Sequence, residues 1–186
     1  MISVKEQLKQ ALSRRQKRHI TKEGHQPAAV LLPIYDNNSE YHLLFTKRTD
    51  KVLKHKGEIS FPGGVAEACD ASLLDTALRE CAEEIGLRAE AVEVLGELDD
   101  MATTTSGYVI SPFIGLIPYP YHFRINHDEI EEIIEIPILS LLDKGTADRD
   151  DMGNHDSCSY HYRGRTIWGA TARILNQFLA IFRQLV

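Results

Sequence analysis

The most informative part of this chain covers residues 61–87 and reads FPGGVAEACDASLLDTALRECAEEIGL. Its second half predicts a helix from about Ser72 to Ile85. Gly86 ends this helix, because glycine readily adopts the left-handed conformation found just past a helix C-terminus. Successive helical residues turn by about 100°, so three carboxylates share a narrow arc of the surface: Glu80, Glu83 and Glu84. Apolar residues on the opposite side give the helix a face toward a core.

The acidic arc requires a neutralising partner. Two glutamates four residues apart destabilise a helix slightly, and only Glu84 is followed four positions later by a basic residue, Arg88. A hard divalent cation bound by carboxylate oxygens, Mg²⁺ or Mn²⁺, meets this requirement. The alternative interpretation is a solvated acidic helix face.

A glycine turn stands in front of the acidic helix. Gly63 and Gly64 allow a tight turn whose backbone amides could face phosphate oxygens. Before this turn, a basic cluster is formed by Lys47, Arg48, Lys51, Lys54, His55 and Lys56. Such a cluster could hold a terminal phosphate of a substrate, and the alternative is a solvated loop.

Hydrophobic patterning predicts the other elements of the chain. Apolar runs predict strands over residues 28–34, 41–46, 91–97 and 108–117, with a loop at 101–107. Further helices are expected over 4–18, 137–142 and 169–184, the first closed by a solvated basic tract at 14–18. A hairpin is expected around Arg163 and Gly164. Because strands and helices are interspersed without strict alternation, we expect the α/β (α+β) class, with a mixed sheet covered by helices.

Composition and charge exclude several classes of protein. Apolar residues make up 43% and charged residues 26% of the 186 residues, which is ordinary for a globular domain. The net charge of −6 disfavours general nucleic-acid binding. The histidines show no zinc-ligand spacing and no Gly-x-Ser-x-Gly motif occurs, so zinc and serine-hydrolase chemistry lack support.

Cysteine usage and apolar runs bear on where the protein resides. Three cysteines without a CxxC pair are typical of a reducing compartment. No apolar run reaches the roughly 18–20 residues of a membrane span, and the N-terminus lacks the apolar region of a signal peptide. We therefore expect a cytoplasmic protein with no membrane partner, while the basic, amphipathic N-terminus leaves an organellar presequence open.

The glycine turn and the acidic helix together resemble the Nudix box. Residues 79–87 read RECAEEIGL and are similar to its core, Arg-Glu-apolar-any-Glu-Glu-any-Gly-apolar, and Gly64 matches its leading glycine. Asp70 stands where the motif has glutamate, and one extra residue separates it from Arg79. The resemblance implies a Nudix hydrolase with an α/β/α sandwich fold and a mixed sheet. Residues 25–186 would form the Nudix domain and residues 1–24 a helical N-terminal extension.

Three further stretches resemble the coenzyme A pyrophosphatase branch of this family: residues 46–64, 106–115 and 167–175. Within the first, Leu53 occupies a position that is usually arginine. The resemblance implies metal-dependent hydrolysis of the pyrophosphate bond of CoA or CoA thioesters, which gives 4′-phosphopantetheine and adenosine 3′,5′-bisphosphate. ADP-ribose or a dinucleotide is an alternative substrate, and a module that senses a nucleotide without cleaving it is an alternative function. The intact glutamate set favours an enzyme acting on a small-molecule nucleotide, and a homodimer is left open.

Residue roles follow from the motif and the resemblance. The metal, Mg²⁺ or Mn²⁺, is expected on Glu80 and Glu84, with Glu83 completing its ligands. Arg79 is expected to orient these glutamates by ion pairing. Tyr108 could stack on adenine or could be an ordinary strand residue. The general base is left open between Glu83, Glu84 and loop acids within residues 97–100 and 128–129. Substrate contacts are expected from Arg48, Lys54, His55, Gly63, Gly64 and Tyr108.

Overall fold

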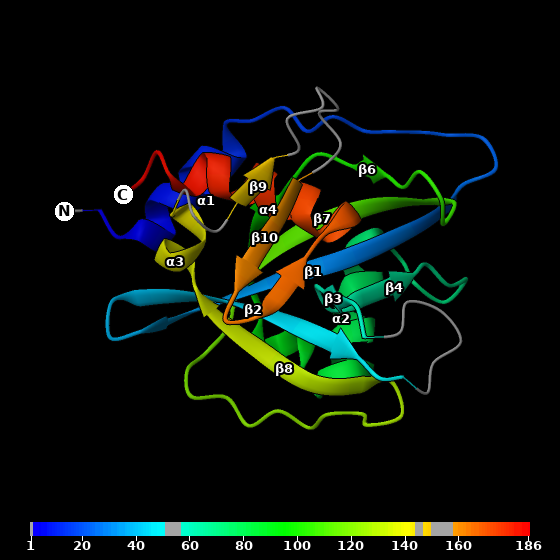
Figure 1. The fold of residues 1–186 in the computed structure, drawn as a ribbon. Coiled ribbons are helices and arrows are strands. Elements are labelled where there is room, and N and C mark those ends of the chain that lie inside the picture. The colour runs from blue at the N-terminus through cyan, green and yellow to red at the C-terminus, as the bar shows by residue number, and fades with distance from the viewer. Residues whose placement is uncertain (1, 51–56, 144–146, 150–157) are drawn as a thin grey trace.

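The computed structural model describes residues 2–50, 57–143, 147–149 and 158–186 (Figure 1). Its helices in this described part are α1 (Val4–Ser13), α2 (Leu73–Ile85), α3 (Ile138–Leu142) and α4 (Gly169–Phe182), with a 3₁₀ turn at Ala89–Ala91. None of them is long and apolar enough to cross a membrane.

A mixed sheet forms the centre of the molecule. Its main path runs β3 (Ile59–Ser60), β2 (Glu40–Arg48), β1 (Gln26–Asn37), β7 (Tyr108–Leu116) and β5 (Glu93–Glu97). Three further strands join it: β4 (Gly63–Val65) pairs with β1, β6 (Met101–Ala102) with β7, and β8 (Ile130–Pro137) with β2. β1 and β7 are parallel, and the other pairs are antiparallel. A smaller antiparallel sheet contains β9 (Ala147–Arg149), β10 (Cys158–Tyr162) and β11 (Arg165–Ile167).

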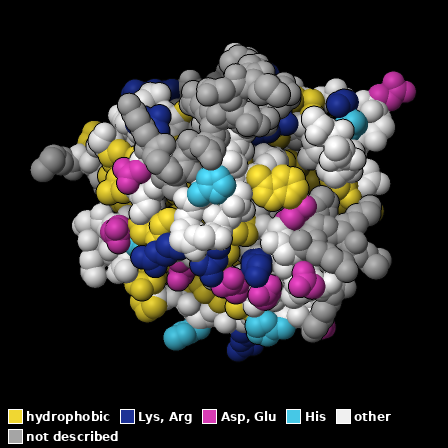
Figure 2. Space-filling view, in the orientation of Figure 1, with side chains coloured by type: hydrophobic (Ala, Val, Ile, Leu, Met, Phe, Trp, Pro, Cys, Tyr) yellow, Lys and Arg dark blue, Asp and Glu magenta, His cyan; other side chains and the backbone are white. Residues whose placement is uncertain are grey.

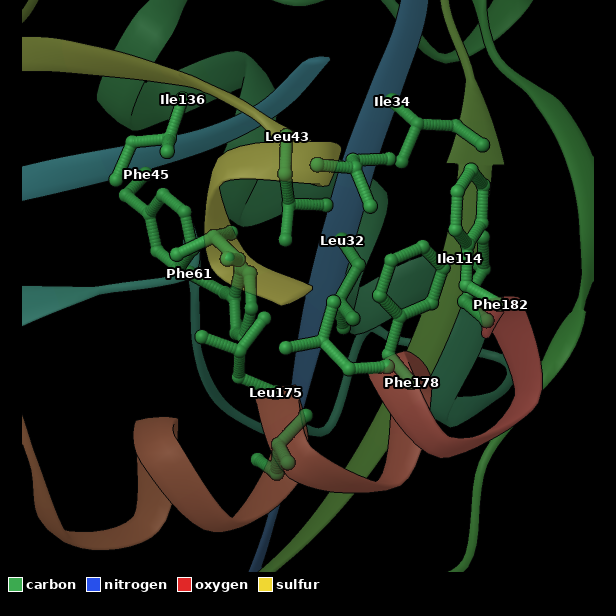
Figure 3. Close-up of a cluster of buried hydrophobic side chains, with 14 of the residues drawn as sticks. Leu32, Ile34, Leu43, Phe45, Phe61, Ile114, Ile136, Leu175, Phe178 and Phe182 are labelled. Carbon is green, nitrogen blue, oxygen red and sulfur yellow. The ribbon is translucent and has the colours of Figure 1, made fainter. Parts of the chain in front are cut away.

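Helices cover both faces of the central sheet, and alternate residues of β1 supply both cores. Leu31 lies in a buried cluster with Ala77, Cys81 and Ile85 of α2. Leu32 and its neighbours on the opposite face lie in a second cluster, which contains Leu8 and Leu12 of α1 and Phe178 and Phe182 of α4. Figure 3 shows the α4 phenylalanines directed at this face of β1. Each fully buried side chain of this size contributes about 1.5–3 kcal/mol. The predicted α/β/α sandwich with a mixed sheet is therefore confirmed.

The local signals for α2 act as expected. The Ser72 side chain accepts a hydrogen bond from the Asp75 amide and caps the helix N-terminus. Gly86 ends the helix in the left-handed conformation, with φ 67°. The hairpin at Arg163–Gly164, the short helix after Pro137 and the final helix are also present.

The N-terminal segment differs from its prediction. α1 ends at Ser13 and has no basic residue in its last turn, so the helix does not extend to residue 18. The tract that follows is not a solvated helix end. Lys17 Nζ lies 2.8 Å from Glu97 and 3.0 Å from Asp100, and its side chain is only 9% exposed. Arg15 Nη2 lies 3.0 Å from Asp99. Acidic residues at the end of β5 and in the β5–β6 connection hold this segment, and the sequence pattern gave no sign of their pairing.

β8 was not expected. Its sequence, IEEIIEIP, does not alternate strictly, and Ile130, Ile134 and Ile136 are buried while Glu131 is exposed. Pairing with β2 from His42–Pro137 to Arg48–Ile130 makes this segment a strand. Long-range pairing therefore decided a segment whose own pattern was ambiguous.

Candidate active site

The candidate site lies where β1 changes partners. Residues 34–37 of β1 pair with β2, and residues 28–30 pair with β4. Gly63 and Gly64, expected to form a tight turn, are the first two residues of β4 and lie opposite Val30 and Ala29. A Cβ atom on Gly63, whose φ is 151°, would clash with the Ala29 carbonyl oxygen. A Cβ atom on Gly64 would clash with the Glu80 carboxylate. Gly63 therefore requires glycine, whereas a side chain on Gly64 would displace the Glu80 carboxylate, so this strand lies directly against the acidic helix.

Glu84 is the buried member of the three glutamates, with 2% of its surface exposed. Its Oε2 accepts a hydrogen bond of 3.2 Å from the Gly63 amide, and its Oε1 lies 3.5 Å from Arg48 Nη1. Burial raises the pKa of Glu84 to about 8, more than Arg48 and the Gly63 amide lower it. The Gly63 amide therefore faces a carboxylate in this structure, and not a free space for phosphate as the sequence suggested.

Arg79 organises the other carboxylates. Its Nη1 lies 2.9 Å from Glu80 and 3.1 Å from Glu83, and its Nε and Nη2 bind the two oxygens of Asp70 at 2.9 and 3.1 Å. The hydrogen bond from Arg79, followed by one from the Glu67 amide, holds the pKa of Asp70 well below its ordinary value. Burial raises the pKa of Glu80, against the lowering effect of Arg79. Asp70, the acid that departs from the Nudix motif, is thus the bidentate partner of Arg79.

A cavity of about 510 Å³ opens beside these residues, within the usual size range of ligand pockets. Its charged walls come from Arg48, Glu58, Glu80, Glu84 and Glu129, next to Gly63 and Gly64. Its remaining walls are largely apolar and come from separate elements. They are Ala28 and Val30 of β1, Phe61 between β3 and β4, Val65 of β4, Tyr108 and Ile110 of β7, and Ala170 and Ile174 of α4.

The cavity brings together most of the predicted site residues that the structure describes. Glu80, Glu84, Arg48, Tyr108 and both glycines line it. Arg79 and Glu83 stand beside it without lining it, and the Glu83 side chain is 56% exposed. Lys54 and His55 lie outside the described residues.

The basic cluster before the turn is divided between two environments. Lys47 Nζ lies 2.9 Å from Glu131 across the β2–β8 pair, whereas Arg48, the next residue, faces the cavity. Figure 2 shows basic and acidic side chains lying next to one another on one face of the molecule. Of the two, only Arg48 is therefore placed to meet a substrate in the cavity.

The structure separates the loop acids that the sequence left as possible bases. Glu97, Asp99 and Asp100 pair with the N-terminal segment. Glu129 lines the cavity, and its Oε1 accepts a hydrogen bond of 3.4 Å from Asn126. Sequence reasoning named no site residue on α4, because the apolar residues of this helix follow a pattern typical of core; Ile174 is 1% exposed and also lines the cavity.

The carboxylates suit a partly hydrated divalent cation. Within residues 2–50, 57–143, 147–149 and 158–186, no three His, Cys, Asp or Glu side chains stand close enough together to enclose a metal ion. Mg²⁺ does not need such a cage, because it keeps several waters and binds through one or two carboxylates plus substrate phosphates. Glu80 and Glu84 supply two hard carboxylates on one cavity wall, and a cation there would favour the ionised form of buried Glu84. The donor set fits such a metal.

Comparisons with known proteins identify the family of this chain. The family model of the NUDIX domain matches residues 24–152. A protein of Yersinia enterocolitica named "Uncharacterized Nudix hydrolase NudL" is 39% identical over 154 residues, which is 81% of this chain and 78% of that protein. The Yersinia pestis protein of the same name is 41% identical over 152 residues, 80% of this chain and 75% of that protein.

Solved structures share the fold at low sequence identity. A MutT/nudix family protein from Enterococcus faecalis superposes with a TM-score of 0.60 at 14% identity, covering 98% of this chain and 70% of that one. The MutT protein from Methanosarcina mazei gives 0.55 at 16% identity, covering 91% and 96%. The structural matches show the fold alone, whereas the family model and the Yersinia relatives match the sequence over most of the chain. This chain therefore belongs to the Nudix hydrolase family.

Proposed function

We propose that this Nudix hydrolase cleaves the pyrophosphate bond of CoA or its thioesters, giving 4′-phosphopantetheine and adenosine 3′,5′-bisphosphate. Nudix hydrolases act on nucleoside diphosphate derivatives and generally need a divalent metal. The finer assignment to CoA rests on the composition of the cavity.

One observation carries the proposal. The three stretches that resemble the coenzyme A pyrophosphatase branch, residues 46–64, 106–115 and 167–175, are distant in the sequence. Each of them contributes to the wall of the same cavity, with Arg48, Tyr108 and Ile174 as examples. Their convergence supports a common substrate, because a resemblance due only to core packing would not gather at one opening. The apolar part of the wall suits a pantetheine chain, which is mostly alkyl and amide.

The acidic residues would hold the metal and its water. Glu80 and Glu84 are the proposed ligands from the cavity wall, and Glu83 completes the set from its exposed position. When bound, Mg²⁺ or Mn²⁺ neutralises charge on the phosphate oxygens and lowers the pKa of water. Arg79 is a positioning residue, because its contacts with Glu80, Glu83 and Asp70 fix the carboxylates. The glycine turn presents no side chain, so a diphosphate can approach the carboxylates closely.

Glu129 is the proposed general base. Among the candidate loop acids at 97–100 and 128–129, it lines the cavity together with Glu80 and Glu84. Its hydrogen bond with Asn126 holds the carboxylate, which can accept a proton from a water that attacks phosphorus. Arg48 is proposed to contact the diphosphate beside Glu84, and Lys54 and His55 remain proposed substrate contacts from the sequence.

A substrate screen tests the proposal. The purified protein is incubated with Mg²⁺ or Mn²⁺ and with CoA, acetyl-CoA, ADP-ribose, diadenosine polyphosphates or nucleoside triphosphates, and products are identified by mass spectrometry. The expected result is the highest kcat/KM for CoA or its thioester, with no turnover after chelation of the metal. A preference for ADP-ribose or a dinucleotide would overturn CoA specificity, and binding without any cleavage would favour the nucleotide-sensing alternative.

A further inference from the structure

A second cavity of about 260 Å³ adjoins the catalytic one. The two share walls at Glu58, Thr103, Ser106, Ala170 and Thr171. The second cavity adds Trp168, which lines no part of the first. A ligand that fills both cavities would therefore extend from Glu80 and Glu84, past Thr103 and Ser106, toward the indole ring of Trp168.

Trp168 is a large exposed side chain that directly follows a buried residue. It is the only tryptophan in the sequence, and 55% of its surface is accessible. Ile167 before it and Ala172 after it are 1% and 0% exposed. A single exposed apolar side chain is ordinary, but this ring stands at the edge of a cavity, where its face is accessible to a ligand.

Trp168 also leaves the N-terminus of α4 without a side-chain cap. Trp168 is the N-cap residue of this helix and provides no side-chain hydrogen bond to it, unlike Ser72 at the start of α2. Serine, threonine, aspartate or asparagine would cap the helix better. Residues that break a local rule without a structural gain are concentrated at functional sites. The Trp168 side chain therefore does not stabilise the start of α4 by capping, and its indole ring is left free of that role.

We propose that Trp168 is the stacking platform for the purine base of the substrate, and that the second cavity is the base subsite. An indole ring offers a wide planar face to any nucleobase, and the neighbouring Thr104, Thr105 and Ser106 carry hydroxyl groups that can bond a base edge. The diphosphate then lies in the first cavity beside Glu80 and Glu84. Tyr108, which lines the first cavity alone, is left to the remainder of the substrate. This inference rests on the proposed function only in taking a nucleotide as substrate.

Fluorescence provides the first test, because a single tryptophan makes the signal specific. The protein with Mg²⁺ is titrated with AMP, ribose 5-phosphate or 4′-phosphopantetheine, none of which contains a pyrophosphate to cleave. We expect saturable quenching by AMP and none by the other two. Quenching by ribose 5-phosphate as well would show that the base is not needed and would overturn the proposal. Quenching by 4′-phosphopantetheine without AMP, or by none of the three, would overturn it too.

Kinetics provide the second test. Trp168→Ala should raise KM for the best substrate about 5- to 100-fold with kcat nearly unchanged, and Trp168→Phe should restore most of the loss. Leu139→Ala is the matched control, since Leu139 is also 55% exposed and lines neither cavity. An unchanged KM in Trp168→Ala would overturn the proposal.

The two proposals fail separately. If ADP-ribose proves to be the substrate, CoA specificity fails, whereas AMP quenching and the KM effect on ADP-ribose are still expected. If CoA is cleaved while Trp168 responds to no adenine nucleotide, the base subsite fails and the proposed function stands.

Discussion

Lys17 and Asp100 form an ion pair of 3.0 Å between side chains that are 9% and 6% exposed. Asp100 also accepts hydrogen bonds from the Ser111 hydroxyl at 2.6 Å and the Ile20 amide at 3.0 Å. Although burial opposes its ionisation, these bonds and Lys17 lower the pKa of Asp100. Asp100 directly precedes β6 and the loop that contains Thr103, so the N-terminal segment is joined to a wall of the catalytic cavity.

Removing one partner of this pair should be costly. Lys17→Met leaves Asp100 buried without its cation, and we expect a loss of about 3 kcal/mol in the free energy of unfolding. Lys9→Met is the control, because Lys9 and Glu93 are 50% and 43% exposed and such surface pairs contribute about 0–1 kcal/mol. Urea denaturation measures both. Equal losses in the two variants would contradict a special role for the buried pair.

The Asp70–Arg79 pair predicts a pH dependence of stability. A carboxyl group whose folded pKa is depressed stabilises the protein above its ordinary value of 3.8, and this contribution is lost as pH falls toward the folded pKa. Asp70→Asn should therefore be less stable than the wild type at pH 7, and the difference should shrink below about pH 4. Denaturant titrations at several pH values measure it. A difference that stays constant down to pH 2 would show that charge on Asp70 is not its cause.

Glu84→Gln separates metal binding from folding. The amide keeps the shape of the side chain and an acceptor for the Gly63 amide, but it removes a charged ligand. We expect turnover to fall by roughly 100-fold or more, with the circular dichroism spectrum unchanged. The metal-free variant should be at least as stable as the wild type at pH 7, because the raised pKa of Glu84 makes folding take up a proton that the amide does not need. Glu90→Gln, an exposed substitution nearby, is the control, and near-normal activity of Glu84→Gln at saturating Mg²⁺ would refute the assignment.

The role proposed for Glu129 as general base predicts an effect on kcat. Glu129→Gln should lower kcat by about 10²–10⁴-fold with a small change in KM, and it should remove the acidic limb of the pH–rate profile. Asp99→Asn provides the comparison, because Asp99 pairs with Arg15 and does not line the cavity. If the pH profile of Glu129→Gln kept its acidic limb, another group would be the base.

The basic cluster before the glycine turn predicts a preference for CoA over dephospho-CoA. A charge-assisted contact with the 3′-phosphate is worth about 1.5–3 kcal/mol, or roughly 10- to 100-fold in kcat/KM. Lys54→Ala should reduce this preference and leave dephospho-CoA hydrolysis little changed. Arg48→Ala should impair both substrates, because Arg48 contacts Glu84. A wild type that treats both substrates alike would exclude a 3′-phosphate reader in this cluster.

The features predicted correctly from the sequence depend on interactions between residues close together in the chain. The acidic arc on α2 and the Ser72 and Gly86 ends of this helix follow from helical spacing and from the conformational freedom of glycine. These features are local, so no knowledge of distant partners was needed.

The features that the sequence did not predict depend on contacts between residues far apart in the chain. Lys17 belonged to a basic tract that is typical of a solvated helix end, and only its contacts with Glu97 and Asp100, about eighty residues away, bury it. Glu129 was one of several loop acids, and the fold alone brings it to Glu80 and Glu84. β8 has an ambiguous pattern that its pairing with β2 resolves.

The packing of α1 and α4 on one face of the sheet limits which truncations of the protein can fold. Figure 1 shows both chain ends on the same side of the molecule, and residues of both helices share one buried cluster. A fragment trimmed to the matched region, residues 24–152, would lose both helices and expose Leu32 and Ile34 to water. It would also lose Ile174 and Trp168 from the two cavities. Such a fragment should aggregate, whereas a circular permutant that links the two ends should keep both the core and the cavities.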